Sequence, residues 1–260
     1  MAHTEVHLRG AHADVVAPGL TDEVAVEEPL EIRVDGRSLA VTMRTPGHDE
    51  ELALGFLYGE GLIDGPRAAG PPADLAGNTV EVAGPLLREP DARSFFTSSS
   101  CGVCGKGALE QVAVQAPAVG DDPAEVIARA LLADLPERLR QPTFARTGGL
   151  HATGLFTFAG ELLEVREDVG RHNAMDKVLG RRLLDGDVPP AAGHVLCVSG
   201  RLSFELVQKA VTAGAPVLVG VGAPTSLAVR LADDRNLTLA GFARRGRVNV
   251  YTGGHRVAAA

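Results

Sequence analysis

The C-terminal part of the chain alternates between short apolar runs and amphipathic segments. The runs HVLCVS and PVLVGVG are continuously apolar, which is typical of buried strands covered on both faces. The pattern predicts strands at 161–166, 194–199, 216–221, 237–242 and 248–251, separated by helices at 173–184, 203–213 and 225–232. This order indicates a layered α/β fold with a mixed sheet and helices on both faces.

The N-terminal part begins with two predicted strands, 28–34 and 38–45, joined by Asp35-Gly36, a two-residue turn that favours a β-hairpin. The segment 49–59 opens with three acidic residues, as the positive end of a helix dipole prefers. We also expect a loop at 64–77, strands at 79–84 and near 95–97, a helix after Lys106, and one or two helices within 121–139.

Domain organisation follows from the same pattern. Residues 1–20 are polar and are expected to form a flexible tail. Residues 21–260 are expected to form a single α/β domain, in which 21–90 makes a smaller subregion around the β-hairpin. A chain of 260 residues is long enough to bury a substantial core of this kind.

Composition narrows the classes of function. Hydrophobic residues at 45% and charged residues at 22% are ordinary for a soluble globular protein. The net charge of −8 argues against broad nucleic-acid binding, which needs a basic face. No apolar run reaches the roughly 18 residues of a membrane span, and the first residues lack the layout of a signal peptide. We therefore expect a cytoplasmic protein without a membrane or nucleic-acid partner.

Two of the three cysteines stand three positions apart, in the segment SSSCGVCGKG. A strand ending at Ser100 and a helix starting near Cys104 would place Cys101 at a helix N-terminus, where the dipole stabilises a nucleophilic thiolate. Cys104 would lie one turn further along. The third cysteine, Cys197, falls within an apolar strand and is expected to be an inert core thiol.

Spacing alone leaves several interpretations of the pair open. The cysteines could be inert and buried. They could bind zinc together with His48, as in nucleobase deaminases, although Ser100 stands where the deaminase signature has proline. A thioredoxin-like dithiol would need a different placement in the chain. Finally, Cys101 could accept sulfur as a persulfide and pass it on.

Several turns have the composition of anion sites. His151 lies in a glycine-rich turn, TGGLHATG, and His172 lies in a polar run at 166–177, where Asn173 is a candidate helix cap. Arg201 follows a Ser-Gly turn and precedes a helix that Ser203 would cap. The segment GFARRGRVNVY places three arginines within four residues, which makes it the best candidate for binding pyrophosphate. Each turn could also be a connection that binds nothing.

Taken together, these segments resemble the formate dehydrogenase accessory sulfurtransferase family, FdhD. The resemblance covers residues 45–252 and rests on motifs that run in family order. They are TPGHDEELALGFLYGEGLI, SSSCGVCGKGAL, TGGLHATGLF, REDVGRHNAMDKVLG, SGRLSFELVQKAV, GAPTSLAVRLA and LTLAGFARRGRVNVYTG.

The resemblance implies a sulfurtransferase that takes persulfide sulfur from a cysteine desulfurase. The acceptor would be the molybdenum bis(molybdopterin guanine dinucleotide) cofactor, bound as a substrate and destined for formate dehydrogenase. The family's persulfide cysteine falls on Cys101 and its partner on Cys104. Its cofactor-contacting segment falls on Phe242, Ala243, Arg244, Arg245, Gly246 and Arg247.

Further properties are implied by the same resemblance: a core similar to cytidine deaminase, a homodimer, and no intrinsic metal. Two alternatives stay open, a zinc-dependent deaminase-like enzyme and a chaperone that binds the molybdenum cofactor without catalysis. The motifs do not assign roles to His48, His151, His172 or Arg201.

Overall fold

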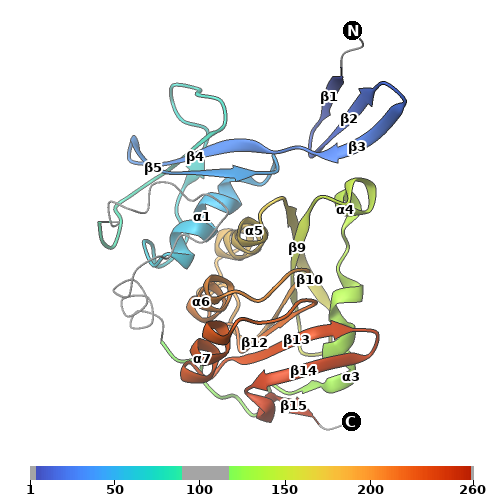
Figure 1. Cartoon of the computed structure of the whole chain (residues 1–260). Coiled ribbons are helices and arrows are strands. Elements are labelled where there is room, and N and C mark those ends of the chain that lie inside the picture. The colour runs from blue at the N-terminus through green and yellow to red at the C-terminus, as the bar shows by residue number, and fades with distance from the viewer. Residues whose placement is uncertain (1–3, 90–116, 259–260) are drawn as a thin grey trace.

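The computed structural model describes residues 4–89 and 117–258 (Figure 1). Cys101, Cys104, the strand expected near 95–97 and the helix expected after Lys106 lie outside these residues. Among the described residues, no helix combines the length and apolar character that crossing a membrane would require.

The largest sheet has six strands in the order β10-β9-β11-β12-β13-β14. The central strands β11, β12 and β13 are parallel, and the outer strands run antiparallel to their neighbours. Five of the six strands were predicted from the apolar runs, whereas the segment of β9 was interpreted as a glycine-rich turn. Their bounds are β9 His151–Phe156, β10 Leu162–Asp168, β11 Val195–Val198, β12 Val217–Gly220, β13 Thr238–Arg244 and β14 Arg247–Thr252.

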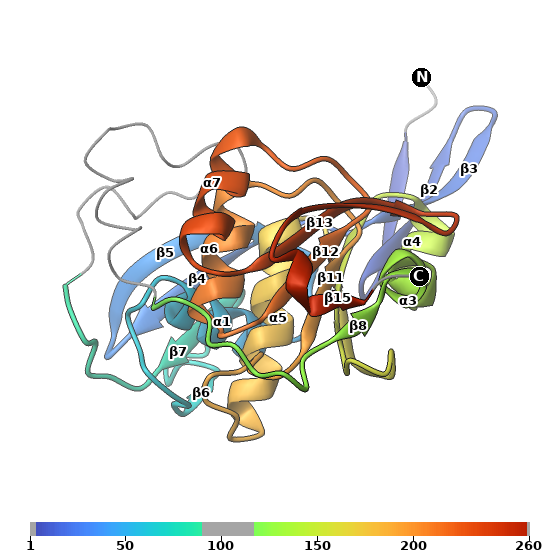
Figure 2. The same cartoon turned by 90° about the horizontal axis from the view of Figure 1, so that it is seen from below.

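Helices cover both faces of this sheet, as the sequence predicted (Figure 2). One face packs against α5 Arg171–Leu184, α6 Phe204–Thr212 and α7 Ser226–Asp234. The opposite face packs against the short elements β8 Ile127–Ala128, α3 Arg129–Asp134, the 3-10 helix η1 Leu135–Arg138 and β15 Val257–Ala258. The helices expected within 121–139 therefore exist, but they begin at Arg129 and not at the Asp-Asp-Pro sequence.

Cys197 lies in the core on the α3 side of the sheet and is fully buried. Burial raises the pKa of its thiol far above the ordinary value, because a thiolate there would lose its hydration. The prediction of an inert core thiol is confirmed.

A second sheet lies on the far side of helices α1 and α5 (Figure 1). Its order is β5-β4-β7-β6, and the predicted hairpin forms its first two strands. Helix α1 lies between this sheet and α5, and Leu183 of α5 belongs to the same apolar cluster. The bounds are β4 Glu28–Val34, β5 Arg37–Arg44, α1 Asp49–Gly59, β6 Ala69–Gly70 and β7 Thr79–Val82.

Helices α1 and α5 cross in direct backbone contact. A Cβ atom on Gly55 would lie 1.8 Å from the carbonyl oxygen of Asp176, and one on Gly180 would lie 1.8 Å from that of Glu51. Only glycine permits this approach, because real Cβ contacts are never so short. The crossing fixes the second sheet on the first.

The first strands correct the expected flexible tail. Residues 5–25 form a three-stranded antiparallel meander, β1 Glu5–Arg9, β2 His12–Ala17 and β3 Leu20–Ala25. Gly10 and Gly19 adopt positive φ angles, 71° and 79°, in its two turns. The polar composition of residues 1–20 concealed these strands, because most of their side chains are solvent-exposed or only half-buried. The meander contacts α4 Pro142–Thr147, where Arg146 donates to both carboxylate oxygens of Glu23 at 2.8 and 2.6 Å.

Candidate functional site at the carboxyl edge of the sheet

The parallel strands β11, β12 and β13 all end at one edge of the six-stranded sheet. Such an edge is the usual ligand crevice of α/β folds. Strand β9 runs the other way and therefore begins there, and its first residue, His151, pairs with Asp168 at the end of β10. Strand β14 begins beside the end of β13, so all six strands of the sheet have an end at this edge.

Backbone hydrogen bonds join the loops along this edge. The amide of Gly222 donates to the carbonyl of Gly200 at 3.0 Å, and the amide of Phe242 donates to the carbonyl of Gly222 at 3.2 Å. A Cβ atom on Gly222 would lie 2.8 Å from both the Gly200 carbonyl oxygen and the Arg201 Cα. Glycine at this position keeps the loops after β11, β12 and β13 together.

Three helices begin at the same edge, because each follows a strand that ends there. Helix α5 starts after Gly170, α6 after Ser203, and α7 after Thr225, whose hydroxyl accepts a hydrogen bond from the Ala228 amide at 3.2 Å. Helix N-termini carry partial positive charge and free N–H groups. The edge is therefore built to favour an anion.

Two arginines add full positive charge. Arg171 is the first residue of α5, and Arg201 lies in the loop before α6. The positive charges of both arginines affect the protonation of His151. The imidazole of His151 lies against the loop after β11, since a Cβ atom on Gly200 would be 3.3 Å from its Nδ1. Burial, followed by the charges of Arg171 and Arg201, lowers the pKa of His151. The imidazole is therefore neutral at pH 7 and the positive charge resides on the guanidinium groups.

His172 joins the starts of two helices. Its Nε2 lies 3.2 Å from the Ser203 hydroxyl and 3.8 Å from a carboxylate oxygen of Glu205. Ser203 stands at the N-cap position of α6, as predicted, but its side chain makes no capping hydrogen bond. Burial lowers its pKa to about 4, with further contributions from Lys209 and Arg171. A neutral His172 can exchange a hydrogen bond with Ser203 at pH 7 without adding charge to the edge.

Buried ion pairs and hydrogen bonds hold the first turns of α5 in place. Lys177 Nζ lies 2.7 Å from Asp168 Oδ2 and donates to the Thr45 carbonyl at 2.8 Å. Asn173 donates to Asp168 at 3.0 Å and to the Met43 carbonyl at 2.8 Å. Asn173 was predicted to cap the helix, but the helix begins two residues earlier and the amide instead bridges to β5.

The arginine-rich segment continues from this edge. Phe242 has a φ angle of 54° and a side chain 39% exposed, next to a register shift that separates Gly241 from Arg244. Arg244 pairs with Arg247 across the β13–β14 turn, and both are exposed. The segment also includes Ala243, buried in the core below the sheet, and Arg245, whose amide donates to Glu137 at 3.1 Å.

Comparison with known proteins assigns the chain to a family. The sequence model of the FdhD/NarQ family matches residues 25–258. The chain belongs to the FdhD/NarQ family. A member from Streptomyces coelicolor, named sulfur carrier protein FdhD, is 52% identical over 91% of this chain and 89% of its own. Another of that name from Mycobacterium tuberculosis is 48% identical over 98% of both chains.

The fold is also found in a solved structure. A crystal structure of a candidate formate dehydrogenase accessory protein from Desulfotalea psychrophila superposes with a TM-score of 0.76. That protein is 25% identical, and the match covers 99% of each chain. The FdhD/NarQ membership and the mixed α/β architecture therefore agree.

Of the residues that the sequence proposed, the edge brings together His151, Arg171, His172, Arg201 and Phe242. These come from turns that are far apart in the chain, and the sheet topology places them at one edge. Cys101 and Cys104, which the sequence analysis predicts to be the persulfide cysteine and its partner, lie outside the described residues.

His48 lies at the start of α1. It occupies the N-cap position with a φ angle of 59°, and its Nδ1 lies 3.3 Å from Glu51. Arg166 donates to Glu51 at 2.6 and 2.8 Å. Burial alone would raise the pKa of Glu51, but hydrogen bonds from His48 and Arg166 lower it to about 2.

Among the described residues, candidate metal ligands gather in threes only at His12, Asp14 and Glu23 on the meander. Both carboxylates are already engaged, Asp14 by Arg9 at 3.1 Å and Glu23 by Arg146. An arginine on each carboxylate competes with a cation, so we assign no metal to this cluster.

Sequence reasoning missed a second buried ion pair beneath the edge. Lys209 of α6 lies 2.8 Å from Asp176 of α5 and 3.6 Å from Glu60. Despite burial, Asp176 and Glu60 raise the pKa of Lys209, whereas burial raises the pKa of Asp176 to about 6. The only signal in the sequence was a lysine within an otherwise apolar helix face.

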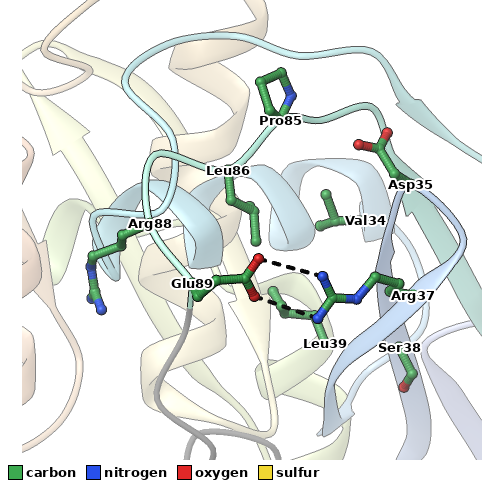
Figure 3. A pocket seen from close by; sticks show the side chains of 9 residues that line it. All are labelled: Val34, Asp35, Arg37, Ser38, Leu39, Pro85, Leu86, Arg88 and Glu89. Atoms are coloured by element: carbon green, nitrogen blue, oxygen red, sulfur yellow. Dashed lines mark hydrogen bonds and ion pairs between the residues drawn. The ribbon is translucent and has the colours of Figure 1, made fainter.

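A cavity of about 330 Å³ lies on the second sheet, at the β4–β5 turn (Figure 3). Its lining includes Leu39, Leu86 and the ion pair of Arg37 with Glu89, whose atoms lie 3.4 Å apart. Both charged side chains are largely exposed. The cavity lacks the convergent buried polar groups of the carboxyl edge, so we place the candidate site at the edge.

Proposed function

We propose that this chain is a sulfur carrier for the maturation of formate dehydrogenase. It accepts sulfur from a cysteine desulfurase as a persulfide on Cys101 and delivers it to the molybdenum bis(molybdopterin guanine dinucleotide) cofactor, which binds as acceptor substrate. The names of the close relatives support the sulfur-carrier role, and the name of the structurally similar protein supports the link to formate dehydrogenase.

Loading of sulfur is a thiolate exchange. The Cys101 thiolate attacks the terminal sulfur of the desulfurase persulfide, a new S–S bond forms on Cys101, and the desulfurase cysteine leaves as a thiolate. Cys104 is close enough in the chain to assist or relay this sulfur. Cys197 cannot compete, because it is fully buried and its thiol is difficult to ionise.

The observation that carries the acceptor site is the convergence of Arg171 and Arg201 with three helix N-termini at one sheet edge. A guanine dinucleotide presents pyrophosphates, which guanidinium forks and helix N-termini bind well. Phe242 and the exposed Arg244 and Arg247 extend this surface for the rest of the dinucleotide. The sheet with helices on both faces also fits the expected cytidine-deaminase-like core.

The experiment follows the sulfur. The protein is incubated with a cysteine desulfurase and cysteine, and protein-bound persulfide is measured. Wild type and Cys197→Ala should load fully, whereas Cys101→Ala should not. Full loading of Cys101→Ala would refute the assignment.

A complementation assay separates the sulfur carrier from a cofactor-binding chaperone. A strain lacking the endogenous protein receives the wild type, Cys101→Ala, Cys104→Ala or the variant lacking both cysteines, and formate dehydrogenase activity is measured. A carrier requires Cys101 for activity. Full activity without both cysteines would instead establish the chaperone, since its cysteines would not be needed.

A further inference from the structure

Tyr251 of β14 presents an aromatic ring to solvent. The chain has no tryptophan and only two tyrosines. Tyr58 is buried in the core of the second sheet, whereas Tyr251 is 38% exposed. An exposed aromatic ring offers a flat apolar face to a ligand. The place of Tyr251 in the fold therefore decides which ligand its ring can reach.

The ring of Tyr251 lies beside the loops of the carboxyl edge. A Cβ atom on Gly241 would lie 3.3 Å from Cε2 of Tyr251 and 3.1 Å from Cδ of Pro224. The ring and the proline therefore occupy the same side of this glycine. Pro224 comes directly before Thr225, the N-cap residue of α7. The Tyr251 ring is thus next to one of the three helix N-termini that favour an anion.

A second exposed ring, that of Phe242, stands close by. Phe242 follows Gly241 directly and is 39% exposed, and its amide donates to the Gly222 carbonyl at 3.2 Å. Gly241 thus has the Tyr251 ring against it and Phe242 after it, so two exposed aromatic residues meet beside the anion site. Nucleobases of every kind stack on aromatic rings, because every base has a π face. The surroundings of Tyr251 therefore suit a nucleotide, which joins a base to phosphate.

We propose that Tyr251 stacks on the guanine base of the nucleotide whose phosphates bind at the carboxyl edge. The phosphates lie at the helix N-termini and at Arg201, and the base covers the Tyr251 ring. This inference rests on the proposed binding of a guanine dinucleotide and adds the residue that holds a base. Stacking uses the face of the ring, so Tyr251→Phe should keep the contact and Tyr251→Ala should lose it.

Tyrosine fluorescence reports the contact directly. In Tyr58→Phe, Tyr251 is the only tyrosine of a chain without tryptophan. Guanosine diphosphate is titrated into this variant, and free tyrosine amide at the same concentration corrects for light absorbed by the nucleotide. Stacking should quench the Tyr251 emission with the same midpoint that calorimetry gives for binding. Inorganic pyrophosphate, which carries no base, should bind without quenching.

Affinities of the position 251 variants separate the ring from its hydroxyl group. Tyr251→Ala should bind guanosine diphosphate about tenfold more weakly than wild type in isothermal titration calorimetry, whereas Tyr251→Phe should bind it like wild type. Inorganic pyrophosphate is the control probe, because it has no base to stack. Wild type and both variants should bind it equally well, which also shows that Tyr251→Ala keeps its fold.

Binding of guanosine diphosphate without quenching would overturn the proposal, and so would equal affinity of Tyr251→Ala and wild type. An equal loss in Tyr251→Phe and Tyr251→Ala would also contradict it, because the hydroxyl group would then make the contact. In each of these cases, binding of pyrophosphate would still support the proposed acceptor site. If wild type binds neither probe, the acceptor site itself is wrong, and the stacking contact is wrong with it.

Discussion

Gly180 of α5 lies against the backbone of Glu51 in α1, so closely that a Cβ atom would come within 1.8 Å of the Glu51 carbonyl oxygen. At the same helix crossing, Gly55 of α1 lies equally close to the backbone of Asp176 in α5. These two glycines set the separation of the helices and hence of the two sheets. Among the glycines of the described residues, these two would bring an added Cβ atom closest to a neighbouring atom.

We predict that Gly180→Ala lowers the free energy of unfolding by about 1–3 kcal/mol, although alanine normally favours a helix. The added methyl group must push the backbone of α1 away, because no flexible side chain can yield. Urea unfolding measures the change. Gly254→Ala is the control, since a Cβ atom there has no neighbour within 4 Å. Equal stability of Gly180→Ala and wild type would show that the helices do not cross so closely.

Lys209→Met should be strongly destabilising, by about 3–5 kcal/mol, because it leaves the buried carboxylate of Asp176 without its partner. Adding Asp176→Asn should recover part of this loss. The control is Arg181→Met, which removes a solvent-accessible pair between Arg181 of α5 and its C-cap residue Asp185 and should cost about 1 kcal/mol or less. A double-mutant cycle by urea unfolding measures the coupling energy between Lys209 and Asp176. Strictly additive effects of the two substitutions would contradict the predicted ion pair.

His172 should make stability depend on acid. Its pKa is about 4 in the folded protein, below the ordinary 6.5, so the unfolded chain binds the extra proton first. The contribution of neutral His172 to the free energy of unfolding is therefore fully present above pH 6.5. It is lost as the pH falls towards 4, by at most about 3 kcal/mol. In His172→Gln this part of the loss should disappear. Unfolding free energies at pH 7 and pH 4.5 test it, with His194→Gln as the control, and an unchanged difference in His172→Gln would refute it.

The carboxyl edge should bind a guanine nucleotide through its arginines. Arg171→Ala and Arg201→Ala should each weaken binding of guanosine diphosphate about tenfold, as expected for a charge-assisted contact to phosphate. The double change Arg244→Ala with Arg247→Ala should also weaken it.

Isothermal titration calorimetry gives the affinities, with Arg230→Ala on the exposed face of α7 as a control that keeps wild-type affinity. If the arginine variants bind as tightly as wild type, the nucleotide does not occupy this edge.

The sequence predicted the central strands of the sheet because β11 and β12 are buried on both faces and therefore continuously apolar. It missed β9, since Gly154 indicates a turn by propensity. In the structure, a Cβ atom on Gly154 would lie 2.5 Å from the side chain of Leu139, so glycine at this position makes room for the segment after η1 to pack on the strand. Tertiary packing, and not local preference, explains that residue.

The candidate site was predictable as separate turns. Arg171 and Arg201 each stood beside a helix start in the sequence, but only the order of strands places those helix starts at one edge. The contact of His172 with Ser203 depends on how α5 and α6 sit on the sheet, which local pattern does not encode. The predicted cap at Asn173 was wrong for the same reason, because its amide is satisfied by β5, more than a hundred residues away in sequence.

Helix α5 belongs to two apolar cores at once, with Met175 and Leu179 in the core of the six-stranded sheet and Leu183 in that of the second sheet. Neither core can lose α5 without exposing its own leucines to water. The two layers should therefore melt in a single cooperative transition, and the amides of α5 should be among the slowest in the molecule to exchange with deuterium.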